Sequence, residues 1–134
     1  MKKLVCVDNK FKTLAPFKVM PKLEELYMAG NKLTALVGWE SLPALKVLHL
    51  RRNEISKIDE ELPPLDELTY LNLRNNAIAN TEMAFKMFQF PNLTNINIFN
   101  NPVEREASSF AVLMATFLIK NPRLTRFCKA PVTE

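Results

Sequence analysis

Glycine, histidine and cysteine are scarce in this sequence, so it has few of the residues on which catalytic and metal sites depend. The 134 residues include two glycines, two cysteines and one histidine. Gly30 and Gly38 do not form the glycine-rich loop that cradles a phosphate. His49 has no cysteine or carboxylate at the spacing of metal ligands in its own part of the sequence. We therefore expect no enzymatic activity, no cofactor and no metal ion.

The two cysteines do not make a disulfide framework. Cys6 and Cys128 lie near opposite ends of the chain, and the sequence has no CxxC pair. Small secreted domains usually carry a denser set of cysteines. The cysteine content therefore indicates a reducing compartment, and we expect the protein in the cytoplasm.

Long hydrophobic runs and a strong net charge are also missing. Although 48% of the residues are hydrophobic, no uncharged apolar run approaches the ~18 residues of a membrane helix. The first ten residues, MKKLVCVDNK, have two lysines but no apolar stretch behind them, so they do not form a signal peptide. We expect no membrane partner. The formal charge of +4 permits an acidic partner without requiring one.

The sequence does contain a clear internal repeat. Five segments align on a shared asparagine: MKKLVCVDNKFKTL, LEELYMAGNKLTAL, LKVLHLRRNEISKI, LTYLNLRNNAIANT and LTNINIFNNPV. Their template is LxxLxLxxNxL, and its asparagines are Asn9, Asn31, Asn53, Asn76 and Asn101. These are spaced 22, 22, 23 and 25 residues apart, which indicates a leucine-rich repeat.

The template combines strand periodicity with a polar turn. In LHL, residues 48–50, the two leucines point to one face of a strand and His49 points to the other. The amide of Asn53 can donate and accept hydrogen bonds, so it can satisfy backbone groups of a buried turn. We expect stacked asparagines to form a ladder, and Ile55 and Ile58 to return the chain to the core. Amphipathic helices are the alternative, but the fixed asparagine and the LxL pair argue against them.

These repeats predict an α/β solenoid with the leucine-rich repeat fold, a right-handed β-α superhelix forming a single domain over residues 1–134. No repeat closes its own apolar face, so each is buried by its neighbours. The predicted units are residues 1–22, 23–44, 45–67, 68–92 and 93–103, with a C-terminal cap at 104–134. Parallel strands should form a sheet along the concave face.

The predicted connections on the convex side are short and contain proline, which favours turns or single turns of 3₁₀ helix. Their expected inward anchors are Phe17, Trp39, Leu62 and Leu65. The segment from Glu82 to Pro91 is longer and has room for about two helical turns.

The two ends of the array differ. From Glu104 to Lys120, apolar residues recur on one helical face, which predicts a capping helix over the last repeat. They are Phe110, Leu113, Met114, Phe117 and Leu118. A truncated sixth strand with Leu124 and Phe127 should follow. We expect no cap at the start, where further repeats, a partner or a second copy would cover Leu4 and Cys6.

With the leucines in the core, the outward strand residues are left for binding. The predicted partner-binding residues are Tyr27, His49, Arg51, Tyr70, Asn72, Arg74, Asn97 and Phe99. Arg51 and Arg74 should stack about 5 Å apart on neighbouring strands, where like charges are unfavourable. Arginine with aromatic neighbours is typical of binding hot spots. Alternatively the arginines are merely solvated, Tyr70 packs across the strands, and Asn72 and Asn97 form an exposed amide ladder.

A rigid surface that presents polar, charged and aromatic side chains is what a protein-interaction scaffold needs. A nucleic-acid-binding protein would need a dense basic stripe with interleaved aromatic residues. Here lysines such as Lys10 and Lys22 are scattered, and acids such as Glu24 and Asp59 interrupt them. We therefore expect a protein partner, and an RNA- or nucleic-acid-associated leucine-rich repeat protein is the less favoured alternative.

The repeats and the terminal NPRLTRF segment resemble the SDS22-like subclass of intracellular leucine-rich repeats with its C-terminal cap. LEELYMAGNKL, LKVLHLRRNEI and LTYLNLRNNAIAN are especially similar to the family of the ciliary leucine-rich repeat-containing protein 23. This resemblance implies a non-catalytic cytoskeletal scaffold in the axoneme of a cilium or flagellum, at the radial spokes. A phosphatase regulatory subunit of the same subclass is the alternative. The ending RLTRFCKAP departs from the usual leucine-aspartate ending, and the long N-terminal array of the ciliary family is absent.

Overall fold

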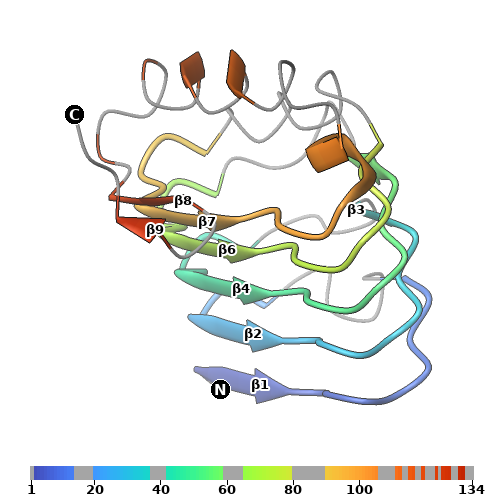
Figure 1. Cartoon of the computed structure of the whole chain (residues 1–134). Helices are drawn as coiled ribbons and strands as arrows, with labels where there is room; N and C mark the ends of the chain where they lie inside the picture. The colour runs from blue at the N-terminus through green and yellow to red at the C-terminus, as the bar shows by residue number, and fades with distance from the viewer. Residues whose placement is uncertain are drawn as a thin grey trace.

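The computed structural model describes residues 2–13, 20–36, 42–58, 65–79 and 90–105, together with 111–112, 115–116, 119, 123, 125–127 and 130–131. Within this part of the chain, successive coils stack along one axis and each adds a short strand to a common sheet (Figure 1). In spatial order its strands are β1 (Lys3–Val5), β2 (Glu25–Tyr27), β4 (Val47–His49), β6 (Tyr70–Asn72), β7 (Asn95–Asn97), β8 (Arg126–Phe127) and β9 (Ala130–Pro131).

The register of the sheet joins equivalent positions of successive repeats. The strands are parallel from β1 to β8, and β9 pairs with β8 in the antiparallel direction. The central strand residues that pair in series are Leu4, Leu26, Leu48, Leu71 and Ile96. The predicted solenoid with a parallel sheet is therefore confirmed.

The core consists of apolar columns that run along the axis of the solenoid. From the second coil onward the central strand residues are almost completely buried, and so are the apolar residues two places later. The latter are Met28, Leu50, Leu73 and Ile98. A third column comes from the opposite side of each coil, where Leu33, Ile55 and Ile78 are fully buried. Because each buried leucine contributes about 1.5–3 kcal/mol, the columns account for the stacking of the coils.

The return segments on the far side of the coil also pair with each other, which the sequence prediction did not include. β3 (Ala35–Leu36) and β5 (Lys57–Ile58) form a second, two-stranded parallel sheet. Just before it, the N–H of Ser56 donates to the carbonyl of Thr34 at 3.0 Å. Buried residues at equivalent positions hold these segments side by side, so extended backbone pairs in segments for which the sequence predicted only a return of the chain to the core.

The convex connections agree with the prediction where the structure describes them. Of the expected anchors, Leu65 is fully buried, whereas Phe17, Trp39 and Leu62 lie outside the described residues, as does most of the segment from Glu82 to Pro91. A single 3₁₀ turn, η3 (Pro102–Arg105), follows the last long coil.

The C-terminal cap begins differently from the prediction. The predicted helix started at Glu104, but residues 102–105 form η3, with Pro102 at its first position, where a missing N–H costs nothing. Residues 111–112, 115–116 and 119 are helical, and Val112 and Ile119 are exposed. The five apolar residues predicted to face the core lie outside the described part of the chain, as does Leu124. β8 occupies the place of the predicted sixth strand.

In each of the first five coils, a residue with left-handed backbone lies three residues after the strand of the main sheet and directly before the repeat asparagine. These residues are Asp8, Gly30, Arg52, Asn75 and Asn100, with φ between 55° and 72°. Such a conformation is strained for most side chains, and Asp and Asn tolerate it best after glycine. Four of the five residues are of these types, and at Arg52 the stacked coils keep the same turn although its side chain does not favour it.

Candidate protein-binding surface

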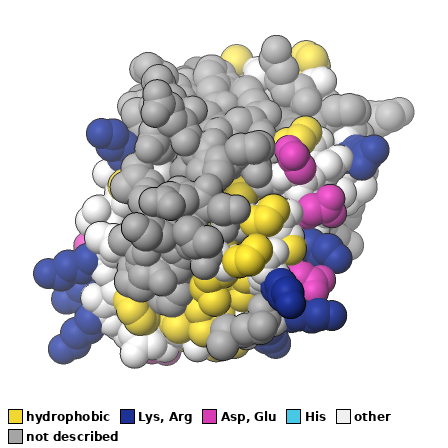
Figure 2. All heavy atoms as spheres, turned by 180° about the vertical axis from the view of Figure 1, so that it is seen from behind, with side chains coloured by type: hydrophobic (Ala, Val, Ile, Leu, Met, Phe, Trp, Pro, Cys, Tyr) yellow, Lys and Arg dark blue, Asp and Glu magenta, His cyan; other side chains and the backbone are white. Residues whose placement is uncertain are grey.

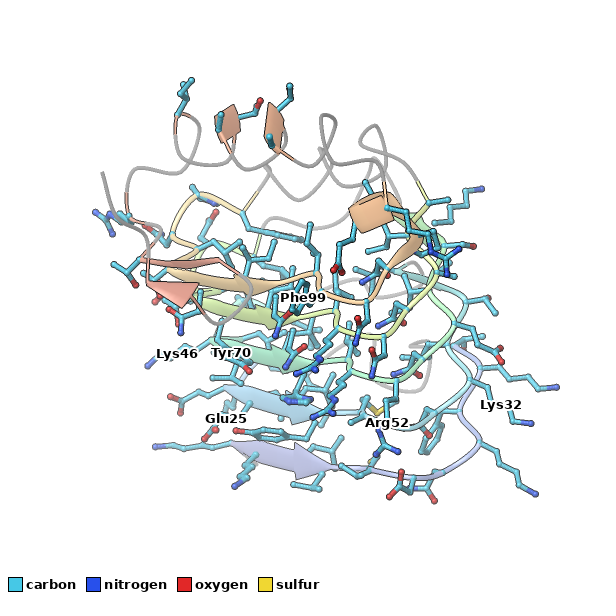
Figure 3. All side chains as sticks on the ribbon, viewed as in Figure 1. Glu25, Lys32, Lys46, Arg52, Tyr70 and Phe99 are labelled. Atoms are coloured by element: carbon cyan, nitrogen blue, oxygen red, sulfur yellow. The ribbon has the colours of Figure 1, made fainter. Side chains whose placement is uncertain are left out.

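The outward face of the seven-stranded sheet presents three rows of side chains, which we call the wall. The first row is Lys3, Glu25, Val47, Tyr70 and Asn95, and the second is Val5, Tyr27, His49, Asn72 and Asn97. The third row follows the strands and consists of Val7, Ala29, Arg51, Arg74 and Phe99. Figure 3 shows Glu25, Tyr70 and Phe99 on this side of the coil, with Lys32 at its far end. The wall thus includes all eight residues predicted to bind a partner.

Three aromatic rings stack along the middle of the wall. The ring centroid of His49 lies 5.8 Å from that of Tyr27 and 6.2 Å from that of Tyr70, with interplanar angles of 29° and 19°. Lys3 adds its ammonium group 5.2 Å from the centroid of the Tyr27 ring. Stacking at these distances fixes the rings relative to one another, so this part of the wall is preorganised.

The wall asparagines are held by the fold itself. Asn72 and Asn97 are buried, at 3% and 5% exposure, which does not fit an exposed amide ladder. The Oδ1 of Asn72 accepts the backbone N–H of Arg74 at 3.0 Å, and the Oδ1 of Asn97 accepts that of Phe99 at the same distance. The Nδ2 of Asn72 donates to Tyr70 Oη and contacts His49 Nε2. Both amides therefore shape the wall, by capping the strand ends and orienting the rings.

Arg51 and Arg74 occupy neighbouring positions in the third row. The coils that carry them are joined by the N–H of Arg52, which donates to the carbonyl of Arg74 at 3.0 Å. Both side chains are partly buried. Among the described residues neither guanidinium has an ion pair or a side-chain hydrogen bond, and the Nε atoms of both are buried without an acceptor.

The carboxylates near the wall are already engaged. Glu25 accepts a hydrogen bond from the hydroxyl of Tyr27 at 2.7 Å. Asp8, just past the end of the third row, lies 3.3 Å from the guanidinium of Arg52. The described part of the wall is therefore positively charged in its third row.

The hydrogen bond from Tyr27 to Glu25 also affects ionisation. It raises the pKa of the Tyr27 phenol above its ordinary value, because ionisation would remove the donated proton; burial and the charge of Glu25 act in the same direction. Tyr27 therefore stays neutral at physiological pH and keeps the stack of rings intact.

Exposed apolar side chains lie at both ends of the wall. Phe99 is 39% exposed at one end of the third row, and Val5 and Val7 are exposed on the first coil. Apolar side chains are also exposed on the opposite side of the molecule, where acidic and basic side chains are interspersed along one border (Figure 2). The exposed apolar groups of the wall differ in that Val7 and Phe99 lie in the same row as Arg51 and Arg74.

Behind the wall, the repeat asparagines bind the backbone of two coils at once. The Nδ2 of Asn53 donates to the carbonyls of Met28 and Leu50 at 3.0 Å, and its Oδ1 accepts the N–H of Leu33 at 3.1 Å. The residues that make the same three kinds of bond are Asn31, Asn53, Asn76 and Asn101. We call these four residues the asparagine ladder.

Asn9 shares the sequence position but not the environment. It is exposed, and its Nδ2 donates only to the carbonyl of Val7 at 3.2 Å. The described residues include no coil before that of Asn9 that could supply the second carbonyl and the N–H. The sequence pattern alone does not distinguish Asn9 from the buried asparagines.

A second series of hydrogen bonds, made by threonine hydroxyls, was not predicted from the sequence. The hydroxyls of Thr69, Thr94 and Thr125 donate to the carbonyls of Lys46, Thr69 and Thr94, at 3.1–3.2 Å. Its signal was the threonine that follows the first leucine in LTYL, LTNI and LTRF. The template LxxLxLxxNxL does not show this threonine, because the position after its first leucine is written as variable.

Other kinds of site have little support in the described residues. They contain no group of three or more histidine, cysteine or acidic side chains that could hold a metal ion. None of their helices is long and apolar enough to cross a membrane. Cys6 is a free thiol, half-buried at the edge of the core.

Comparisons with known proteins agree with the architecture. Residues 21–67 match a family model of leucine-rich repeats, in two copies. No curated protein sequence matches significantly. The chain is thus a leucine-rich repeat solenoid, and folds of this class present extended binding surfaces.

Two solved structures illustrate the likeness. A chain in the crystal structure of the Drosophila melanogaster SNF/U2A′ complex is 23% identical, with a TM-score of 0.71, over 84% of this chain and 63% of that chain. The Leptospira interrogans leucine-rich repeat protein LIC12759 is 24% identical, with a TM-score of 0.71, over 92% of this chain and 30% of that chain. This chain therefore spans less than two thirds of either neighbour, and at such identities the likeness concerns the fold.

Proposed function

We propose that this chain is a non-catalytic interaction module that binds a protein partner on its wall. The observation that carries the proposal is the pair Arg51 and Arg74, which has no ion pair among the described residues, beside the stacked rings and the exposed ring of Phe99. Side chains of these types are over-represented at interface hot spots. The fold supplies the rigidity, because the capped strand ends keep the wall in one conformation before a partner arrives.

The cellular setting of this module is proposed from the sequence resemblance alone. It favours a cytoplasmic scaffold in the axoneme of a cilium or flagellum, with a phosphatase regulatory subunit as the alternative. The similarity to a chain of the SNF/U2A′ complex adds that a protein of this fold occurs in a complex with another protein. That similarity supports a protein partner here without naming one.

The test is quantitative affinity capture from an extract of the cells that express the protein. Three immobilised forms are compared with wild type: Arg51→Ala with Arg74→Ala, Phe99→Ala, and a control with Lys32→Ala and Lys57→Ala. The control removes two exposed cations away from the wall. Melting temperatures of all forms should be within about 4 °C of wild type, because the altered side chains lie outside the core and each replacement should change the free energy of unfolding by no more than about 1 kcal/mol.

We expect the wall variants to capture at least several-fold less of a specific protein, and the lysine control to capture as much as wild type. If both wall variants capture the same proteins in the same amounts as wild type, the wall is not the binding surface.

A further inference from the structure

The arginine pair has the features of an anion-binding site within the wall. An arginine has five N–H donors in a fixed fork. Among the described residues, those of Arg51 and Arg74 have no side-chain acceptor, although the Nε atoms are buried. Both residues are only partly buried, so the exposed part of each side chain is open to an acceptor from outside the chain.

The stability of the fold does not explain the pair. Equivalent positions on adjacent coils lie about 4.8 Å apart, and like charges at that separation are unfavourable. The neighbouring Arg52 shows the alternative, because its guanidinium lies 3.3 Å from Asp8. Among the described residues, Arg52, which points past the wall, thus has a carboxylate partner, whereas Arg51 and Arg74, which line the wall, have none.

Two guanidinium groups on adjacent coils match carboxylate chemistry. Arginine binds a carboxylate through two parallel charge-assisted hydrogen bonds, and a pair on adjacent coils can hold one carboxylate between them or two side by side. The next coil continues the row with Phe99, whose ring is 39% exposed. A segment that lies along the third row therefore meets two cations and then an apolar surface.

We propose that the wall recognises an acidic segment of its protein partner, with carboxylates on Arg51 and Arg74 and an adjacent apolar side chain on Phe99. This inference rests on the proposed function and adds the chemistry of the partner. It requires no movement of the backbone, since the strand ends that carry all three residues are already fixed by hydrogen bonds.

A carboxylate on a protein segment fits this surface better than a nucleic acid. Nucleic acids bind to long basic stripes and stack their bases on open aromatic faces. Here the His49 ring lies between Tyr27 and Tyr70, so both of its faces are covered. The third row has two cations and then ends in an apolar ring.

The experiment uses the full chain and three probes. The first is the acetylated and amidated peptide Gly-Glu-Asp-Leu-Phe-Gly. The second is its uncharged analogue Gly-Gln-Asn-Leu-Phe-Gly, and the third is a short single-stranded oligouridine. Each is titrated into isotope-labelled protein, and the arginine Nε–Hε signals are followed by NMR, together with Arg51→Gln/Arg74→Gln and the matched control Lys32→Gln/Lys57→Gln.

We expect the acidic peptide to shift the signals of Arg51 and Arg74 and to bind at least about tenfold more tightly than the amide analogue, since hydrogen bonds to charged groups are the stronger ones. The arginine variant should abolish that difference, and the lysine control should keep it. Equal affinity for the two peptides, or no shift at either arginine, overturns the proposal. Tighter binding of oligouridine at the same signals overturns it in favour of a nucleic acid.

The outcome separates this inference from the proposed function. If Phe99→Ala loses the captured partner while the acidic and amide peptides bind alike, the wall binds a protein but not through carboxylates. If neither wall variant loses a captured protein, the proposed function itself fails, whatever the peptides do.

Discussion

The asparagine ladder and the arginine pair lie within a few residues of each other on the same coils, yet the fold uses them very differently. Asn53 donates to two backbone carbonyls and accepts one backbone N–H. Arg51, two residues earlier, has a buried Nε without an acceptor among the described residues. The ladder therefore holds the coils together, whereas the arginines are available to a partner. Mutations should separate the two roles.

The largest effect is expected from Asn53→Ala. This change leaves two carbonyls and one N–H without their partner inside the solenoid, which should lower the free energy of unfolding by about 1–3 kcal/mol. Urea denaturation followed by circular dichroism measures the loss. Asn9→Ala is the matched control, because Asn9 is exposed and bonds only within its own turn; it should change stability by less than about 0.5 kcal/mol. Equal losses at both positions would show that the ladder does not depend on burial.

Gly30→Ala should have the next largest effect. The φ of Gly30 is 72°, and an added Cβ would collide with the carboxylate of Asp8. An alanine in the left-handed conformation should by itself lower the free energy of unfolding by about 1–2 kcal/mol. The same denaturation experiment measures it, and Asp8→Ala in the same chain separates the collision from the backbone term. A Gly30→Ala protein as stable as wild type would mean that the turn relaxes out of the left-handed region.

The arginine pair should contribute nothing to stability. Replacing Arg51 and Arg74 by glutamine removes a like-charge repulsion between adjacent coils, so the free energy of unfolding should stay constant or rise by about 0.2–1 kcal/mol. Lowering the salt concentration should enlarge the difference in the free energy of unfolding between the variant and wild type, because the repulsion between the arginines is then less screened. If the double variant loses more than about 1 kcal/mol of its free energy of unfolding, the arginines are structural residues, like those of the asparagine ladder.

The same contrast explains how much of the molecule could be predicted from its sequence. The solenoid and its strand register follow from short-range patterns, because LxL pairs and a fixed asparagine specify one coil and stacking repeats it. Four of the left-handed residues before the asparagines, Asp8, Gly30, Asn75 and Asn100, are of the types that tolerate this backbone, so the sequence carries a signal for the turn. Arg52 gives no such signal, and its conformation comes from the stack of coils.

The composition of the wall was predictable, but the state of its side chains was not. Alternation along the strands places Asn72 and Asn97 outward, and only the structure shows that they are buried and occupied by neighbours. The pairing of β3 with β5 was missed for a related reason: it depends on two return segments being held in register by the core rather than on a strand pattern in either one.

The smallest predicted effect is the pH dependence of Tyr27, which tests whether the wall is preorganised. Its pKa is raised by the hydrogen bond to Glu25, and a raised folded-state pKa stabilises the protein fully below the unfolded value, about pH 10. That contribution is lost as the pH rises through the folded value. Absorbance titration of tyrosinate in a Tyr70→Phe protein isolates Tyr27, because the chain has two tyrosines. Glu25→Gln should bring the transition back toward the ordinary pKa. If the substitution leaves the transition unchanged, the phenol is not held by Glu25, and the fixed geometry of the ring stack must have another origin.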